Sequence, residues 1–131
     1  MLLIDSSAWI EYLRRDDTSA SEAVRAAIRD QQAAVTDVVL LEVLGGTTSS
    51  ARLERWQRLM AGCAYLEQRP REDVETAADL YRRCRSRGKT PRALNNCLLA
   101  AVAIRVNLPV LHRDRDFDVL ARHTPLQVVA A

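Results

Sequence analysis

Three acidic residues stand directly after two short apolar segments, and acids in such places can bind metal ions. Asp5 follows the apolar run 1–4, whereas Asp114 and Asp116 follow the run 108–111. Short apolar runs of this kind are typical of buried parallel strands. In an open parallel sheet the binding crevice lies beyond the carboxyl ends of the strands, so these carboxylates are predicted to be neighbours.

A fourth acid, Glu42, interrupts an otherwise apolar helical segment, 38–44. A helix that faced solvent there would carry more polar residues, so Glu42 is expected to join the other acids if its helix packs over the same edge. Each acid also has an ordinary structural alternative, as a helix cap, a turn residue or a solvent-facing side chain. The combination of the four acids is what favours a site.

Carboxylates that share one crevice repel one another and cannot all stay ionised near neutral pH without compensation. A divalent cation supplies that compensation. Oxygen donors without neighbouring His or Cys ligands favour Mg²⁺ or Mn²⁺ over zinc, and His112 is interpreted as structural. Such ions lower the pKa of a bound water and stabilise the attacking and leaving oxygens of a phosphodiester, which predicts metal-dependent hydrolysis.

The segments that must position these acids alternate between strands and helices. Strands are predicted at 1–4, 33–36, 64–66, 108–111 and 126–129. Helices are predicted around 9–13, 21–29, 38–44, 53–60, 74–84 and 94–104, and a short one follows 112–118 and ends at about 122. Thr90 is a good cap and Pro91 a good first residue for the helix whose apolar body is 94–104. This alternation predicts a three-layer α/β/α sandwich with a central parallel sheet of about five strands.

Length and composition limit the class of protein. The chain has 131 residues, a size that fits one domain, 1–131, and 48% of its residues are hydrophobic. No apolar run approaches the roughly 18 residues of a membrane span, and the early Asp5 argues against a signal peptide, so a cytoplasmic protein is expected. Three widely spaced cysteines, an odd number, predict free thiols rather than disulfides or a zinc site.

Net charge is only +2, which gives no global argument for nucleic-acid binding. The local distribution is more informative, because basic residues crowd one stretch near the end of the 74–84 helix and beyond. This stretch is interpreted either as a solvated helix surface or as a phosphate-binding rim, since Arg binds phosphate with two parallel hydrogen bonds. Its members are Arg82, Arg83, Arg85, Arg87, Lys89 and Arg92.

Four segments, taken together, resemble the VapC toxins. They are 3–10 (LIDSSAWI), 41–46 (LEVLGG), 92–100 (RALNNCLLA) and 112–117 (HRDRDF), and their order and spacing match over essentially the whole chain. The resemblance implies a PIN fold and a Mg²⁺- or Mn²⁺-dependent endoribonuclease acting on tRNA or rRNA. It also implies a homodimer and a VapB-type antitoxin whose C-terminal segment lies in the acidic groove.

Carried over residue by residue, the family's acids match Asp5, Glu42, Asp114 and Asp116, and Ser7 matches a hydroxyl residue near the site. The chain departs from the pattern at one position, where Asn96 replaces an acid at the start of the long helix. An amide keeps the shape of the side chain but loses its charge, which weakens metal binding and catalysis. Either the asparagine is a deliberate inactivating change, since an active toxin kills its host, or it is natural.

Other interpretations compete with a nuclease. A haloacid dehalogenase-type phosphatase needs a second Asp where Ser7 stands, and a receiver domain needs a Lys after a late strand, whereas the only lysine lies in a predicted loop. A catalytically silent RNA- or antitoxin-binding protein with the same fold stays open. Trp9, Tyr12 and Leu13 are expected to line either a contact with a partner or the protein's own core.

Overall fold

The computed structural model describes residues 1–130, which form five strands and seven helices. The strands are β1 (Leu2–Ile4), β2 (Ala33–Thr36), β3 (Ala64–Leu66), β4 (Val110–His112) and β5 (Val128–Ala130). The helices are α1 (Ser6–Leu13), α2 (Ser19–Arg29), α3 (Asp37–Gly45), α4 (Ser50–Ala61), α5 (Glu72–Ser86), α6 (Leu94–Val106) and α7 (Arg115–His123).

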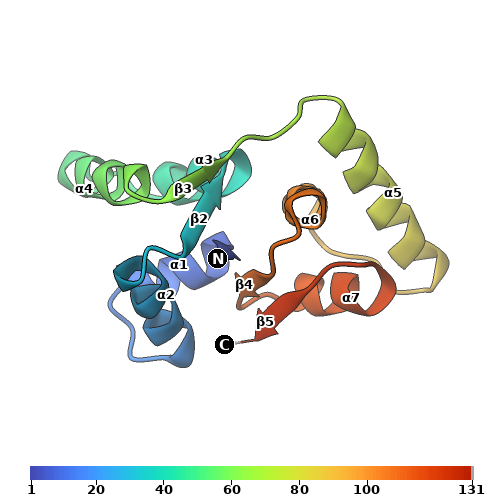
Figure 1. Cartoon of the computed structure of the whole chain (residues 1–131), viewed down its shortest axis with the longest axis horizontal. Coiled ribbons are helices and arrows are strands. Elements are labelled where there is room, and N and C mark those ends of the chain that lie inside the picture. The colour runs from blue at the N-terminus through green and yellow to red at the C-terminus, as the bar shows by residue number, and fades with distance from the viewer. Residues whose placement is uncertain (131) are drawn as a thin grey trace.

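The strands form one sheet in the order β3-β2-β1-β4-β5, and every pair is parallel. Helices α1 to α4 cover one face of the sheet and α5 to α7 cover the other (Figure 1). The reversal of strand order falls at β1, whose neighbours are β2 and β4. The predicted three-layer sandwich with a parallel five-stranded sheet is therefore confirmed, and its central strand carries Asp5 at its carboxyl end.

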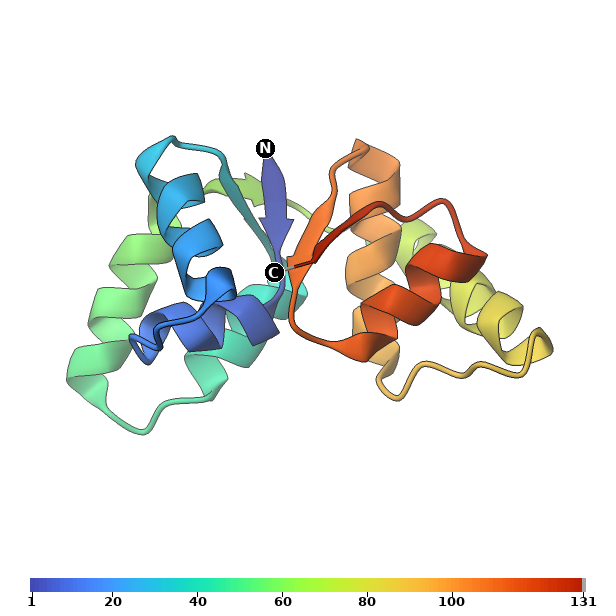
Figure 2. The same cartoon turned by 90° about the horizontal axis from the view of Figure 1, so that it is seen from below.

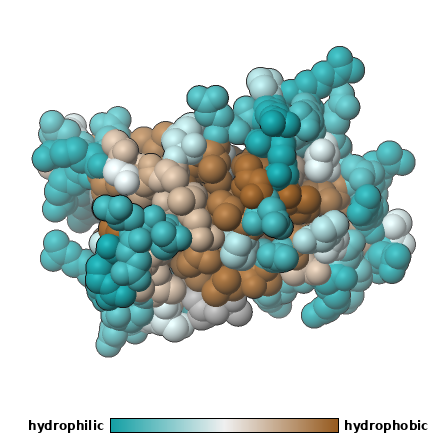
Figure 3. Space-filling view, in the orientation of Figure 1, coloured by the Kyte–Doolittle hydropathy of each residue, from teal (hydrophilic) through white to brown (hydrophobic). Residues whose placement is uncertain are grey.

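Because every strand pair is parallel, the carboxyl ends of the strands share one edge, towards which β1 and β4 run from the top of Figure 2. The starts of α1, α3, α6 and α7 lie at that same edge. Figure 3 shows the opposite edge, where apolar side chains gather in the middle of the face between hydrophilic helices on either side. Among residues 1–130, no helix is both long and apolar enough to cross a membrane.

The core fills both layers between sheet and helices with aliphatic side chains and two large aromatic ones. Trp9 and Phe117 are both fully buried, one on each side of the sheet. Removing an aromatic side chain from such a place costs about 3–5 kcal/mol of stability. The hypothesis that Trp9 lines a partner contact is therefore wrong, because its ring packs into the protein's own core; Tyr12 and Leu13 are partly buried against the same core.

Helix α6 does not begin where its local signals predicted. Its capping residue is Ala93 rather than Thr90, and Pro91 lies in the preceding loop. The backbone N–H groups of Arg92 and Ala93 donate to the carboxylate of Asp116 at 2.9 and 3.0 Å. Because these tertiary bonds satisfy the two donors outside the helix, the chain stays extended there despite good local capping residues.

The last two strands begin two residues later than predicted. Asn107 takes the left-handed conformation, with φ of 58°, and ends α6, while the N–H of Leu108 bonds to the carbonyl of Ala103 at 3.0 Å. This helix-ending turn uses residues that the apolar pattern assigned to a strand. The delay places His112 within β4 and leaves Asp114 two residues beyond the strand.

A buried ion pair ties α5 to α6 away from the acidic residues. Asp73, only 1% exposed, accepts hydrogen bonds from Arg105 at 2.8 and 2.9 Å and from the N–H of Arg69 at 2.7 Å. Burial alone would raise the pKa of Asp73, but these bonds outweigh it and hold the pKa below its ordinary value. Arg105 also donates to the carbonyl of Glu67 at 2.9 Å, which fixes the segment before α5.

Candidate active site

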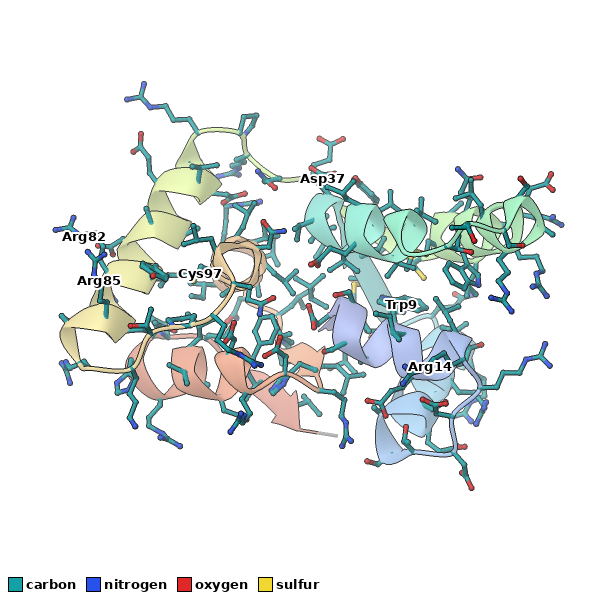
Figure 4. All side chains as sticks on the ribbon, turned by 180° about the vertical axis from the view of Figure 1, so that it is seen from behind. Trp9, Arg14, Asp37, Arg82, Arg85 and Cys97 are labelled. Carbon is teal, nitrogen blue, oxygen red and sulfur yellow. The ribbon has the colours of Figure 1, made fainter. Side chains whose placement is uncertain are left out.

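Figure 4 views the molecule from behind Figure 1, onto the edge at which the strands end. Neighbouring strands β1 and β4 bring Asp5 and Asp114 to this edge, because Ile4 pairs with Leu111 and the N–H of Asp5 donates to the Leu111 carbonyl at 2.9 Å. Helix α3, which contacts α1 and α6, brings Glu42 to the same place. The structure thus gathers the acids that the sequence predicted.

Asp5 is both a helix cap and a candidate ligand. It is 2% exposed, and its Oδ2 accepts hydrogen bonds from the N–H of Ser7 at 3.0 Å and from the Ser7 hydroxyl. Its Oδ1 is buried and has no hydrogen-bond partner among residues 1–130. An unpaired buried carboxylate oxygen is costly, so this atom favours a bound cation or water.

The electrostatics of Asp5 reflect this arrangement. Burial raises the pKa of the Asp5 carboxyl most strongly, the Ser7 bonds oppose that effect, and repulsion from Asp114 adds to it. A raised pKa means that the folded protein disfavours the charged form. The protein therefore holds a carboxylate whose charge it does not itself compensate.

Glu42 lies at the rim of the same pocket, on α3. Its Oε1 accepts a hydrogen bond from the Ser6 hydroxyl at 3.2 Å. The pKa of Glu42 is raised, first by partial burial and then by repulsion from Asp5 and Asp114, which exceed the lowering by Ser6. The carboxylates of Asp5, Glu42 and Asp114 are therefore close enough to feel one another's charge, although Glu42 is exposed.

Asn96 joins the remaining two acids into a hydrogen-bonded group. Its side-chain amide donates to Oδ2 of Asp114 at 3.0 Å and to Oδ2 of Asp116 at 2.9 Å. Asp116 is almost fully buried, and its two oxygens also accept the N–H bonds from Arg92 and Ala93. Asp114 caps α7 by accepting the N–H of Asp116 at 2.9 Å. The carboxylates of Asp114 and Asp116, unlike that of Asp5, therefore have hydrogen-bond donors on several sides.

Ser7 connects the two parts of the site. Besides its bonds to Asp5, its hydroxyl oxygen accepts the backbone N–H of Arg113 at 2.9 Å. Glu11, on α1 and largely buried, accepts a hydrogen bond from Arg113 Nε at 2.9 Å. These two contacts fix the loop between β4 and α7 against α1, and so fix the distance between Asp5 and Asp114.

Sequence reasoning missed Ser6, Glu11 and Arg113. A hydroxyl directly after a strand-terminal acid was the available signal for Ser6, and an acid one turn into an apolar helix was the signal for Glu11. Nothing in the local pattern points to Arg113, because its contacts join residues about 100 positions apart.

His112 has the surroundings of a structural residue. It is buried against the ring of Phe117, with ring centres 5.2 Å apart, and its Nδ1 accepts the N–H of Asp114 at 3.2 Å. All three cysteines are free, as predicted. Burial, helped by Cys84 and Asp116, raises the pKa of Cys97 to about 12, so this thiol beside the site is not a nucleophile.

The donor chemistry of the pocket fits a hard cation, since all its charged donors are carboxylate oxygens and one buried oxygen lacks a partner. The spacing is looser than in a preformed site. Among residues 1–130, no three His, Cys, Asp or Glu side chains converge closely enough to hold a metal ion. Asn96 stands where a further carboxylate would complete such a group with Asp114 and Asp116.

An α/β/α sandwich with acids at the carboxyl ends of β1 and β4 is the arrangement of PIN domains, and the PIN domain family model matches residues 2–123. The VapC ribonuclease Mb1587 of Mycobacterium bovis and the ribonuclease VapC11 of Mycobacterium tuberculosis are each 39% identical over 132 residues. Each match covers 99% of this chain and 98% of the relative. The chain belongs to the VapC family of PIN-domain ribonucleases.

Solved structures of low sequence identity share the fold. VapBC2 from Rickettsia felis, bound to a DNA fragment from its promoter, has a TM-score of 0.75 at 14% identity. DNA-bound VapBC from Salmonella typhimurium has a TM-score of 0.74 at 15% identity. Both matches cover 99% of this chain and 98% of the other.

Proposed function

We propose that this chain is a metal-dependent endoribonuclease toxin that cuts phosphodiester bonds of tRNA or rRNA, with Mg²⁺ or Mn²⁺ at the carboxyl edge of the sheet. One observation carries the proposal. Asp5 is a buried carboxylate with an unpaired oxygen, and it repels two further acids in the same pocket. Isolated burial of this kind is unfavourable without a cation, and catalytic sites are where such groups concentrate.

Asp5, Glu42 and Asp114 would hold the ion, whereas Asn96 and Asp116 already share hydrogen bonds. When bound, the ion supplies an activated water and charge stabilisation for the leaving oxygen. The chain's own residues orient these ligands. Ser6 positions Glu42, and Ser7 positions Asp5 while holding the β4–α7 loop.

Asn96 makes this protein a weakened nuclease. Its amide presents N–H groups to Asp114 and Asp116, whereas an aspartate there would add a negative charge and replace that donor with a second acceptor oxygen. Loss of that charge lowers the affinity for a divalent ion. We expect a cost of roughly a hundredfold or more in cleavage rate, because one ion's electrostatic share of catalysis is several kcal/mol.

The same hydrogen bonds favour a second candidate function, a catalytically silent member of the family that binds RNA or an antitoxin. In that case the Asn96 amide, which donates to both Asp114 and Asp116, satisfies these two carboxylates in place of a metal ion. The groove would still attract cationic side chains, because Asp5 and Glu42 remain uncompensated.

A cleavage assay separates the two functions. Total RNA is incubated with Mn²⁺ and the parent chain, the Asn96→Asp variant, or the double variants Asn96→Asp/Asp5→Ala and Asn96→Asp/Glu54→Gln. The last removes an exposed acid on α4 and serves as the matched control. A nuclease predicts strong cleavage by Asn96→Asp and its control, weak cleavage by the parent and none with Asp5→Ala. Absence of cleavage in all four supports the silent protein.

We further propose that this chain is a single-domain cytoplasmic protein. Its proposed partners are a VapB-type antitoxin and a second copy of the chain. The similar solved structures named above are VapBC assemblies, which supports the antitoxin. Co-expression with an antitoxin and light scattering of the product tests both partners. A monomer that captures no antitoxin would refute this part of the proposal.

A further inference from the structure

The loop from α5 to α6 carries three exposed cations towards the acidic pocket. We call residues 87–93 the basic loop; its cations are Arg87, Lys89 and Arg92. In Figure 2 this segment runs along the bottom edge, the edge at which the strands end and α7 begins. The basic loop therefore leads from the outer helix α5 to the mouth of the candidate site.

The backbone of the basic loop is held at both ends. At its start, the N–H groups of Arg87 and Lys89 donate to the carbonyl of Cys84, at 3.0 and 3.1 Å, and Gly88 supplies the left-handed turn with φ of 75°. At its end, Arg92 and Ala93 donate to Asp116. The three cations are thus displayed from a fixed backbone, which lowers the entropy lost when they bind a ligand.

Two cations of the basic loop make no ion pair within the described residues, whereas the third makes only long ones. Within residues 1–130, neither Arg87 nor Lys89 makes an ion pair. The side chain of Arg92 is 73% exposed and forms long ion pairs with Asp114 at 3.8 Å and with Asp116 at 3.9 Å, both beyond hydrogen-bond distance. Arg92 therefore lies beside the acids, and most of its side chain stays exposed.

The arginines of α5 itself behave differently, although the sequence grouped them with the basic loop. Arg83 pairs with Asp79 at 3.2 Å, and Arg85 lies over the ring of Tyr81. Figure 4 shows Arg82 and Arg85 on the side of α5 that faces away from α6. The predicted single positive face is thus divided, and only the basic loop points to the acidic edge.

We propose that the basic loop binds the sugar–phosphate backbone of the RNA and guides the strand into the acidic pocket; this rests on the proposed function. An anionic pocket repels RNA, and a net charge of +2 gives little long-range steering, so local cations beside the pocket must supply the attraction. Arg87 and Arg92 can each hold a phosphate with two hydrogen bonds, and Lys89 with a point charge.

The test measures binding of a fluorescent single-stranded RNA oligonucleotide in EDTA, so that cleavage plays no part. The variants are R87Q/K89Q/R92Q, R87Q/K89Q, and the matched control R52Q/R55Q/R58Q, which removes three exposed arginines from α4 at the far end of the molecule (Figure 1). The logarithm of the binding constant is plotted against the logarithm of salt concentration. Circular dichroism checks that each variant is folded.

We expect the magnitude of the slope of this plot to fall by about 2 in the triple variant and by about 1.4 in the double variant, since each lost phosphate contact removes about 0.7. The Kd of the triple variant should rise by about tenfold or more at low salt, whereas the control should match the parent. The double variant keeps Arg92, so its loss cannot come from disturbance of Asp114 and Asp116.

Equal slopes in the parent and all variants, or no RNA binding by the parent, would overturn the assignment. The assignment would also fail if the basic-loop variants kept the RNA slope of the parent but bound an oligoglutamate peptide more weakly. That result would point to an acidic protein partner. Loop-dependent RNA binding by a chain whose Asn96→Asp variant cuts nothing would leave the assignment standing and refute the nuclease.

Discussion

Asp5 and Asp73 are two almost completely buried aspartates that the fold treats in opposite ways. Asp73 meets Arg105 and a backbone N–H, and its pKa is lowered; Asp5 meets only uncharged donors of Ser6 and Ser7, and its pKa is raised. Both side chains are shielded from solvent, but Asp73 has a cationic partner that Asp5 lacks. The ion pair of Asp73 stabilises the fold, whereas the charge of Asp5 would be stabilised by a bound cation.

The comparison predicts the largest loss of stability at Asp73. Asp73→Asn leaves Arg105 charged and without its partner, and breaking such a pair costs about 3–5 kcal/mol. Urea denaturation should show this loss. The double variant Asp73→Leu/Arg105→Met should recover much of it, because two apolar side chains leave no charge stranded. If Asp73→Asn were as stable as the parent, the ion pair would not be holding α5 to α6.

As the pH falls, the contributions of Asp5 and Asp73 to stability should change in opposite directions. Asp5 and Glu42 have raised pKa values, so stability is gained as the pH falls from neutral through those values towards their ordinary 3.8 and 4.5. Asp73 has a lowered pKa, so its contribution is full above its ordinary 3.8 and is lost as the pH falls below that.

Melting temperatures in EDTA from pH 7 to pH 2 should therefore rise slightly and then drop. In Asp73→Asn the acidic drop should shrink. A profile that falls steadily from pH 7, with no rise, would contradict the raised pKa values of Asp5 and Glu42.

The smallest effect is expected at Asp5. Asp5→Asn keeps an acceptor for Ser7 but removes a charge that burial and Asp114 disfavour, so stability should rise by up to about 1 kcal/mol at neutral pH. Urea denaturation without metal measures this change. A loss of more than about 1 kcal/mol would show that Asp5 is a structural acid like Asp73.

Sequence reasoning predicted the alternation of strands and helices, the parallel sheet and the closeness of Asp5 to Asp114, because the place of strand-terminal carboxylates is fixed by parallel topology. It failed at Thr90 and Pro91, where strong local helix signals lose to the hydrogen bonds that the next two backbone N–H groups donate to Asp116. It also missed the ion pair of Asp73 with Arg105 and the link from Glu11 to Arg113. Both join distant segments, and no local period records them.

Trp9 shows a further limit. An aromatic residue in a short amphipathic helix fits a core or an interface equally well, and only the packing of α1 against its neighbours places the ring inside. The basic run likewise divides only in three dimensions, because α5 ends at Ser86 and turns the following cations towards another edge.

The most direct test of the acidic pocket is calorimetric titration of Mn²⁺ into the parent chain, Asn96→Asp, and Asn96→Asp/Asp5→Asn. The account predicts weak binding by the parent, binding by Asn96→Asp that is tighter by about tenfold or more, and loss of that gain when Asp5 is neutralised. Equal affinity in the three proteins would contradict the claim that Asp5 and position 96 belong to one metal site.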